Sequence, residues 1–358
     1  MTNTLCLRVD KTSGELVKKI LIKSNLLDHS RRITADDETV FLLIPVIEKP
    51  DNGQMRELCL VSHSVELISA ELPPLKAPKH TLRELLFGQM PDALIIHLPR
   101  SFDIVGDILI IESLEVAVLP YKSLIGKSLL ELNPNVKTVL LKVGKVEGEY
   151  RVPKYEFLVG ISKYDTTHQE YGIKLKVDVS KVYFSPRLGA ERKRIAQQVV
   201  TGETIVDMFA GVGPFSLLIA KQVAAEVISI DLNPNAINLL KENLLLNKLK
   251  GSITPMCGDA RIVAKPFFGR ADRVIMNLPG HALEFLDVAL ALIKSIGGKI
   301  HLYTFAKDDP IKNATHNLGE VASKLLPAYE IQAVRIVKPT APREWQVAMD
   351  ITILGNGS

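Results

Sequence analysis

From residue 182 onward, short apolar runs alternate with segments whose apolar residues recur at helical spacing. The runs predict strands near residues 204–209, 227–231, 253–257, 273–277 and 299–304. Helices are expected between them, including Pro234–Asn247 and Ala282–Lys294, and this alternation is typical of a parallel sheet. Two further alternating runs, 331–337 and 346–354, predict a final strand pair. Residues 179–358 are therefore expected to form a Rossmann-like α/β domain.

Two smaller α/β units are predicted ahead of this domain. The first, residues 1–70, should hold strands at Leu5–Val9 and Thr39–Val46, and a helix over Ser13–Ser24 with Leu16, Ile20 and Leu21 on one face. Residues 71–80 contain three prolines, which exclude a helix or central strand and predict a semi-rigid linker. The second unit, residues 81–178, should hold a helix over Leu82–Phe87. Its strands are expected near residues 106–112, 136–142, 155–161 and 173–179, the last two as a closing pair.

The most informative polar positions follow the first two Rossmann strands. The apolar run that ends in Phe209 gives way to Gly211 and Gly213, which open a helix over Pro214–Gln222, and the second run ends in Asp231. In a doubly wound sheet, this spacing puts a glycine turn after the first strand and a carboxylate after the second. Such a carboxylate can accept hydrogen bonds from a ribose diol. The pattern predicts an adenosine-type cofactor.

Two cofactors compete for that geometry. A dinucleotide site needs a third glycine where Ser216 stands, and Pro214 removes a backbone donor. Asp207, just ahead of the glycines, would repel a pyrophosphate but suits the cationic amino or sulfonium group of S-adenosylmethionine (AdoMet). Asp207 taken alone would more simply cap the turn. With Asp231 in register, the pattern favours AdoMet.

Two later strand ends carry further candidates, each with a plain structural alternative. Asp259 can accept a hydrogen bond from the exocyclic amine of adenine, or it can cap the helix that follows. The segment Asn277–Gly280 can orient a planar base at the rim of the sheet, or it can be an ordinary strand-to-helix turn.

A basic segment, residues 181–195, precedes the first Rossmann strand and includes Tyr183, Glu191 and Arg192. Most charge runs of this kind are solvated helix faces. Glu191, however, is the only acid in the run, and the surrounding cations should favour its ionised, proton-accepting form. Glu191 is therefore a candidate general base.

Composition adds little to this picture. The chain has 358 residues, of which 47% are hydrophobic and 23% charged, and its net charge of +4 permits a polyanionic partner without requiring one. The three cysteines are scattered, so neither a disulfide framework nor a metal site is expected. The N-terminus lacks a signal-peptide pattern and no long uncharged apolar run occurs, so a cytoplasmic protein is expected.

Five motifs follow one another along the chain: Ser185–Arg192, Val206–Ser216, Asn233–Ile237, Val274–Pro279 and Ala341–Glu344. Together they resemble the archaeal and eukaryotic tRNA guanine-37 N1-methyltransferases, and the similarity extends over most of the chain. Residues 49–57 look like a longer insertion than that family carries.

The resemblance implies a monomeric, three-domain, AdoMet-dependent enzyme that methylates N1 of guanosine 37 in tRNA. Its first domain would touch the outer corner of the tRNA, and its middle domain would help to clamp the anticodon stem. By the same resemblance Glu191 accepts the N1 proton and Arg151 stabilises charge on O6. The matching positions for the base pocket are Tyr183, Asn277, Leu278 and Pro279, and those for the cofactor are Arg192, Asp231, Leu232, Asp259 and Ala260.

Binding of tRNA phosphates would need a broad cationic surface. The candidates for it are Lys142, Lys145, Arg151, Lys154, Lys181, Arg187, Lys193 and Arg194. Wyosine-pathway enzymes that act on the same nucleotide, by aminocarboxypropyl transfer or by methylation of a tricyclic intermediate, remain an alternative. A nicotinamide-dependent oxidoreductase and a non-catalytic RNA-binding protein are more distant ones.

Overall fold

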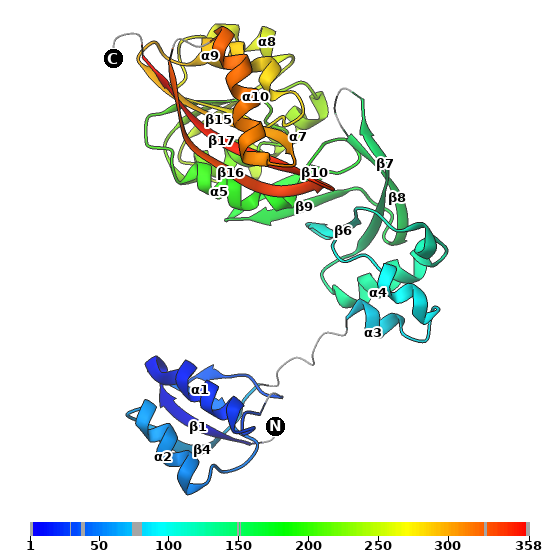
Figure 1. Cartoon of the computed structure of the whole chain (residues 1–358), viewed down its shortest axis with the longest axis vertical. Coiled ribbons are helices and arrows are strands. Elements are labelled where there is room, and N and C mark those ends of the chain that lie inside the picture. The colour runs from blue at the N-terminus through cyan, green and yellow to red at the C-terminus, as the bar shows by residue number, and fades with distance from the viewer. Residues whose placement is uncertain are drawn as a thin grey trace. The chain divides into compact units, whose positions relative to one another are not determined.

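The computed structural model describes residues 3–28, 30–36, 40–73, 81–148, 150, 152–325 and 328–355. Arg151 and most of the predicted linker 71–80 lie outside the described residues. The chain divides into two compact units, Met1–Thr81 and Leu82–Ser358 (Figure 1). Within the described ranges, no helix has the length and apolar character that crossing a bilayer requires.

The N-terminal unit is a four-stranded antiparallel sheet with two helices. Its strand order is β2 (Thr34–Ala35), β3 (Phe41–Pro45), β1 (Thr4–Asp10) and β4 (Val65–Ala70). The helices are α1 (Gly14–Lys23), which follows a 3₁₀ turn at Lys11–Ser13, and α2 (Asn52–Val61).

One expectation for this unit is wrong in detail. In α1, Leu21 is buried as predicted, but Leu16 is 51% exposed and Val17 is buried in its place. The segment interpreted as an insertion contains the start of α2. Asp51 and Gln54 form a reciprocal capping box there, a helix-start signal that the sequence itself carries.

The second unit begins with a sheet in the order β5 (Asp103–Val105), β6 (Ile108–Ile111), β7 (Thr138–Glu147) and β8 (Val152–Gly160). It is packed by α3 (Leu82–Leu86), α4 (Lys122–Leu132) and 3₁₀ turns at Asp92–His97 and Val116–Tyr121.

The predicted closing pair is wrong, because β8 pairs with β7, whereas β10 (Ile173–Asp178) pairs with β9 (Asp165–Glu170). The tight turn Tyr171–Gly172 has positive φ at both residues, the geometry that favours a two-residue hairpin. The strand nearest in sequence therefore becomes the partner of β10.

The large sheet has the order β13 (Ser252–Cys257), β12 (Glu226–Asp231), β11 (Thr204–Asp207), β14 (Arg273–Met276), β15 (Gly297–Lys307), β17 (Glu344–Leu354) and β16 (Tyr329–Ala341). The first five strands are parallel, and β17 and β16 add an antiparallel end. The order reverses at β11 and β14, the switch point at which open α/β sheets bind ligands. This sheet confirms the predicted Rossmann-like domain.

Helices cover both faces of the large sheet (Figure 1). One face packs against α5 (Gly189–Ala196), α6 (Pro214–Gln222) and α7 (Pro234–Leu246), together with the β9–β10 hairpin. The opposite face packs against α8 (Ala260–Val263), α9 (Leu286–Leu292) and α10 (Pro310–Leu325). The helix expected over 282–294 is shorter, since Ala282–Phe285 forms a 3₁₀ turn; another occupies Lys265–Phe267.

Candidate active site

The turn after β11 contains two glycines, Gly211 and Gly213, and Gly213 is the harder one to replace. Gly211 and Gly213 have φ values of +56° and +84°. A Cβ at Gly211 would meet only ordinary contacts, whereas at Gly213 it would overlap the Leu240 side chain. Gly213 thus combines a left-handed backbone with close packing of α6 against α7.

Asp231, at the end of β12, ties this turn to the next one. Its Oδ2 accepts from the Gly211 amide at 2.7 Å and its Oδ1 from the Asn233 amide at 2.8 Å. Burial raises the pKa of Asp231, and the two amides oppose that rise. Because two ionised carboxylate oxygens offer about four acceptor positions, Asp231 retains capacity for further donors.

Asp207, at the end of β11, is completely buried. Its Oδ2 accepts from the Ser216 hydroxyl, which in turn accepts from Ser229, both at 2.8 Å. Within the described part of the chain, Oδ1 of Asp207 has no hydrogen-bond partner of normal geometry. Burial raises the pKa of Asp207 to about 7, the Ser216 hydrogen bond opposes the rise, and the Asp231 charge adds to it. One oxygen of Asp207 is therefore fixed to α6 through Ser216, which is linked in turn to β12 through Ser229.

Asp259 caps α8, the structural alternative that the sequence left open. Its Oδ1 accepts from the Arg261 amide at 2.9 Å, and its Oδ2 forms a 2.6 Å ion pair with the Arg261 side chain. Those contacts lower the pKa of Asp259. Nearby, Ala260 is buried and Leu232 is 38% exposed. The Phe209 ring packs edge-on against Phe285, with 5.1 Å between ring centroids.

The segment before α5 lies across the glycine turn. The Asn233 side chain donates to the Lys181 carbonyl at 2.7 Å, and the Tyr183 carbonyl borders Gly211. Tyr183 itself is 46% exposed. Local hydrogen bonds thus bring the start of this basic segment to the edge of the sheet where the carboxylates lie.

Arg192, expected to contact the cofactor, is held by another group. It is almost fully buried and forms a forked ion pair with Glu170 of β9, at 2.6 and 2.7 Å. Burial alone would raise the pKa of Glu170, but His168 and Arg192 together lower it. This pair fastens the hairpin to α5.

Glu191 faces the sheet from α5, next to Tyr303 of β15. Its Oε2 accepts from the Tyr303 hydroxyl at 3.0 Å and from Nη2 of Arg194 at 2.7 Å. Nε of Arg194 is shared between Oε2 at 3.0 Å and Oε1 at 3.1 Å. Burial and the Glu191 charge raise the pKa of Tyr303 well above its usual range, so its hydroxyl is a donor at neutral pH.

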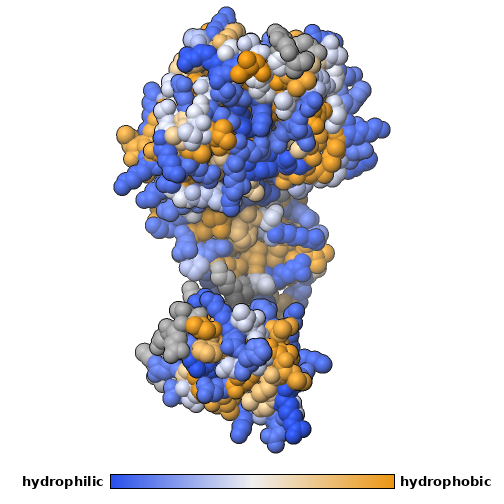
Figure 2. Space-filling model, turned by 90° about the vertical axis from the view of Figure 1, so that its left-hand side faces the viewer, coloured by the Kyte–Doolittle hydropathy of each residue, from blue (hydrophilic) through white to orange (hydrophobic). Residues whose placement is uncertain are grey.

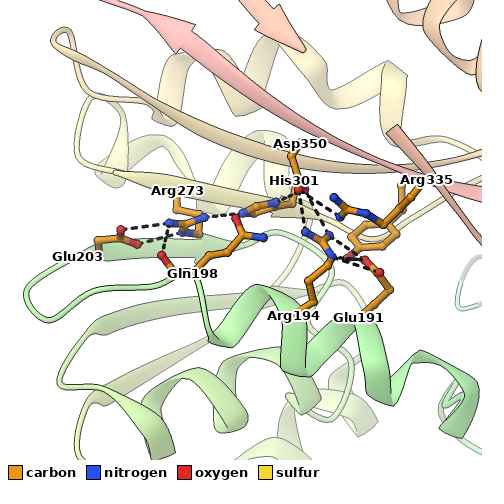
Figure 3. Close-up of polar contacts among 9 residues, drawn as sticks. Glu191, Arg194, Gln198, Glu203, Arg273, His301, Arg335 and Asp350 are labelled. Carbon is orange, nitrogen blue, oxygen red and sulfur yellow. Dashed lines mark hydrogen bonds and ion pairs between the residues drawn. The ribbon is translucent and has the colours of Figure 1, made fainter. Parts of the chain in front are cut away.

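A line of charged groups continues from Arg194 across the sheet (Figure 3). Arg194 also binds Asp350 of β17 at 2.7 Å, and Asp350 accepts from Arg335 at 3.1 Å and from Nδ1 of His301 at 2.7 Å. Burial alone would raise the pKa of Asp350, but His301 and Arg194 lower it well below its usual range. Nε2 of His301 lies 2.6 Å from Arg273, which pairs with Glu203.

The register of the sheet brings Glu191 close to the turn after β14. Met276 pairs with Leu302, so Tyr303 stands where β14 runs into Asn277. Asn277 accepts a hydrogen bond from Gln346 at 3.2 Å, and the Pro279 carbonyl accepts from the Phe305 amide at 3.3 Å. Glu191 and the predicted base-pocket turn therefore share one edge of the sheet.

Sequence reasoning identified Glu191 but missed the groups that hold it. Tyr303, His301 and Asp350 lie in strands whose patterns look apolar or alternating, and no local motif marks them. Arg194 was expected on a phosphate-binding surface, which is wrong: it points inward to Glu191 and Asp350. Three other candidates for that surface form ion pairs: Lys142 with Glu112, Lys181 with Asp178, and Arg187 with Asp103.

On the face drawn in Figure 2, the large unit is largely hydrophilic, with several hydrophobic patches between the hydrophilic areas. Among the described residues, no cluster of three His, Cys, Asp or Glu side chains has the arrangement of a metal site.

Comparison with known families agrees with this geometry. The TRM5/TYW2 methyltransferase domain matches residues 166–331, the TYW2 N-terminal domain residues 82–163, and the tRNA methyltransferase 5 N-terminal domain residues 6–54. The chain is 40% identical over 351 residues to tRNA (guanine(37)-N(1))-methyltransferase Trm5b of Pyrococcus abyssi, covering 98% of this chain and 99% of that relative. The chain belongs to the Trm5 family. The resemblance stated above is thus confirmed, and the family is AdoMet-dependent.

Solved Trm5 structures have the same architecture. The crystal structure of P. abyssi Trm5b matches with a TM-score of 0.72 at 38% identity, covering 98% of this chain and all of that one. A complex of aTrm5 with tRNALeu matches with a TM-score of 0.67 at 37% identity, covering 98% and 99%. The wyosine-pathway aminocarboxypropyltransferase of Pyrococcus horikoshii is 35% identical over only 77% of this chain. The Trm5 relatives therefore account for more of the sequence, and the wyosine alternative is not favoured.

Proposed function

We propose that this Trm5-family protein transfers the methyl group of AdoMet to N1 of guanosine 37 in tRNA. The observation that carries the proposal is the Glu191 carboxylate, held by Arg194 and Tyr303 beside the turn that begins at Asn277. The names of the Trm5 relatives supply the substrate class.

The carboxyl ends of β11, β12 and β13 fit AdoMet. Asp231 retains acceptor capacity for a ribose diol, and Oδ1 of Asp207, at the end of β11, is buried without a hydrogen-bond partner among the described residues. AdoMet, when bound, supplies an electrophilic methyl group, so the reaction needs no metal. The residues proposed to hold it are Arg192, Asp207, Phe209, Gly211, Gly213, Asp231, Leu232, Asp259, Ala260 and Asn277. For Arg192 this requires an exchange of its Glu170 partner.

The chemistry rests on removing a proton. N1 of guanine carries a hydrogen and has no free lone pair, so methylation needs a base within hydrogen-bond reach of N1–H. We propose Glu191 as that base. Arg151, outside the described residues, would stabilise the charge that develops on O6. Tyr183, Asn277 and Pro279 would enclose the guanine after it leaves its stack, a step that costs a few kcal/mol.

The proposed partner is tRNA, bound by a monomer in the cytoplasm. We assign residues 1–70 to the outer corner of the tRNA, residues 81–178 to the anticodon stem and residues 179–358 to catalysis. Exposed cations such as Lys154 would bind phosphates, so affinity should fall with rising salt concentration.

The test is single-turnover methyl transfer to a tRNA transcript with guanosine at position 37, followed by nucleoside mass spectrometry. A methyl mass on guanosine is expected, with no product from a transcript that has adenosine at position 37, since adenosine carries an amino group in place of the O6 that Arg151 is proposed to contact. An aminocarboxypropyl mass would instead identify a wyosine-pathway enzyme.

The roles of the two catalytic candidates are tested separately. Glu191→Gln should keep AdoMet and tRNA affinity but lower the single-turnover rate by about 10²-fold or more. A near-normal rate would remove Glu191 as the base. Arg151→Ala should also reduce the rate more than the affinity; if only tRNA affinity falls, Arg151 is a phosphate contact.

A further inference from the structure

The charged groups behind Glu191 form a balanced set drawn from five segments. Its acids are Glu191, Asp350 and Glu203, and its cations are Arg194, Arg335 and Arg273. His301 stands between Asp350 and Arg273. Because an arginine can only donate, Nε2 of His301 accepts and Nδ1 carries the hydrogen that Asp350 receives. Burial lowers the pKa of His301 to about 4, so the ring is neutral at pH 7.

The two oxygens of Glu191 are not equivalent in this arrangement. Oε2 has three donors within 3.0 Å, from the Tyr303 hydroxyl and from Nη2 and Nε of Arg194. Oε1 has one, the shared Nε at 3.1 Å. Since each carboxylate oxygen accepts about two hydrogen bonds, Oε2 is saturated and Oε1 has room for another donor.

We propose that Asp350 is a positioning residue for the base: by holding Nη1 of Arg194, it directs the guanidinium so that Oε2 of Glu191 is saturated and Oε1 is left to receive the guanine N1 proton. The inference rests on the proposed function, in which Glu191 is the base. In the step, the N1–H bond breaks, Oε1 gains the proton, and the N1 electron pair forms the bond to the methyl carbon as the carbon–sulfur bond breaks.

Asp350 has a second effect, on charge. Arg194 is shared between two carboxylates, so its charge is not directed at Glu191 alone. Without Asp350, both Arg194 and Arg335 would lose a carboxylate partner. The positive charge of Arg194 would then act on Glu191 alone and make it a weaker proton acceptor. Without Arg194, Glu191 would keep only the neutral Tyr303 hydroxyl and would hold a proton more strongly.

The experiment compares Asp350→Asn with Arg194→Met. The single-turnover rate is measured against pH at saturating AdoMet and tRNA, and the acid limb reports the protonation of the base. Asp350→Asn should lower the plateau about tenfold and move the acid limb to lower pH. Arg194→Met should move it in the opposite direction. A merely structural role would not shift the limb in opposite directions.

The control is Asp272→Asn. Like Asp350, Asp272 pairs with a cation, Lys294, but it lies at the amino end of β14, away from Glu191, and accepts from the Thr204 amide. Its profile should match the wild type. Tyr303→Phe keeps every ion pair in place and should move the acid limb slightly upward with about a threefold loss of rate, so it tests the arrangement even if Asp350→Asn does not fold.

The outcomes separate the two proposals. An active Glu191→Gln variant would rule out Glu191 as the base, and this inference with it. If Glu191→Gln is inactive, the proposed base stands. The positioning role alone is then overturned if Asp350→Asn and Arg194→Met keep the wild-type acid limb, or if both variants move the acid limb in the same direction. An unchanged profile for Tyr303→Phe also counts against it.

Discussion

In the two halves of the large sheet, the buried carboxylates receive their hydrogen bonds from partners at different separations along the chain. At β11, β12 and β13, carboxylates accept from groups close in sequence: Asp231 from amides 20 and 2 residues away, Asp207 from a hydroxyl 9 residues away. At β15 and β17, partners from distant strands are added to a local pair: Glu191 lies three residues from Arg194, but Glu191 and Tyr303 are 112 residues apart, and Arg194 and Asp350 are 156 apart.

This difference is consistent with the roles proposed above for the two halves. Short-range partners fix the shape of a turn, which is what a cofactor cradle needs. Long-range partners fix a side chain relative to another strand, which is what a proton acceptor beside a foreign base needs. Four changes test the contrast.

The largest expected effect concerns Arg192, which fastens the β9–β10 hairpin to α5. Arg192→Met would leave Glu170 buried without its cation, at a cost of about 3–5 kcal/mol of folding free energy. Chemical denaturation measures that loss. If Arg192→Met lowers AdoMet affinity with unchanged stability, Arg192 belongs to the cofactor cradle and the Glu170 pair is incidental.

The second prediction concerns pH and the long-range half. The folded pKa of His301, about 4, lies below the unfolded value of 6.5, so the unfolded chain binds more protons between them. The stability that His301 contributes is full above pH 6.5 and is lost as pH falls toward 4, by roughly 3 kcal/mol. Denaturation midpoints across that window should fall less steeply for His301→Asn, which has no ring to protonate. Equal slopes would contradict the assignment.

The third prediction tests the short-range half through its glycines. Gly213→Ala should cost about 2 kcal/mol, from the positive φ and the Leu240 overlap together. Gly211→Ala is the matched control and should cost only about 1 kcal/mol, since its Cβ meets no close neighbour. Thermal unfolding distinguishes them, and equal losses would mean that the Leu240 contact is unimportant.

The smallest expected effect is on cofactor affinity. Asp231→Asn replaces one acceptor oxygen by a donor and should weaken AdoMet binding about tenfold, or about 1.4 kcal/mol, in calorimetry. Asp259→Asn keeps its cap and loses an exposed ion pair, so its effect should be smaller. The reverse order would make Asp259 the stronger cofactor contact.

Periodicity and turn chemistry made the large sheet predictable. The strands from 204 to 304 and the final pair were placed correctly, because buried parallel strands are apolar throughout and the intervening helices repeat at 3.6 residues. The hairpin β9–β10 was missed because strand partners depend on a turn, Tyr171–Gly172, in which a non-glycine residue adopts positive φ. The face of α1 shifted from Leu16 to Val17 because packing against the sheet, and not spacing alone, decides which residue is buried.

The sequence by itself determined the family, through five motifs that follow one another along the chain. It also determined the glycine turn and the carboxylates that follow β11 and β12, since these lie within about 25 residues of one another. It also marked Glu191 as the lone acid of a basic run. Only the tertiary structure decided which distant groups complete the surroundings of that acid, because Tyr303 reaches Glu191, and Asp350 reaches Arg194, from strands far along the chain. A contact between strands far apart in the chain has no local pattern from which it can be read.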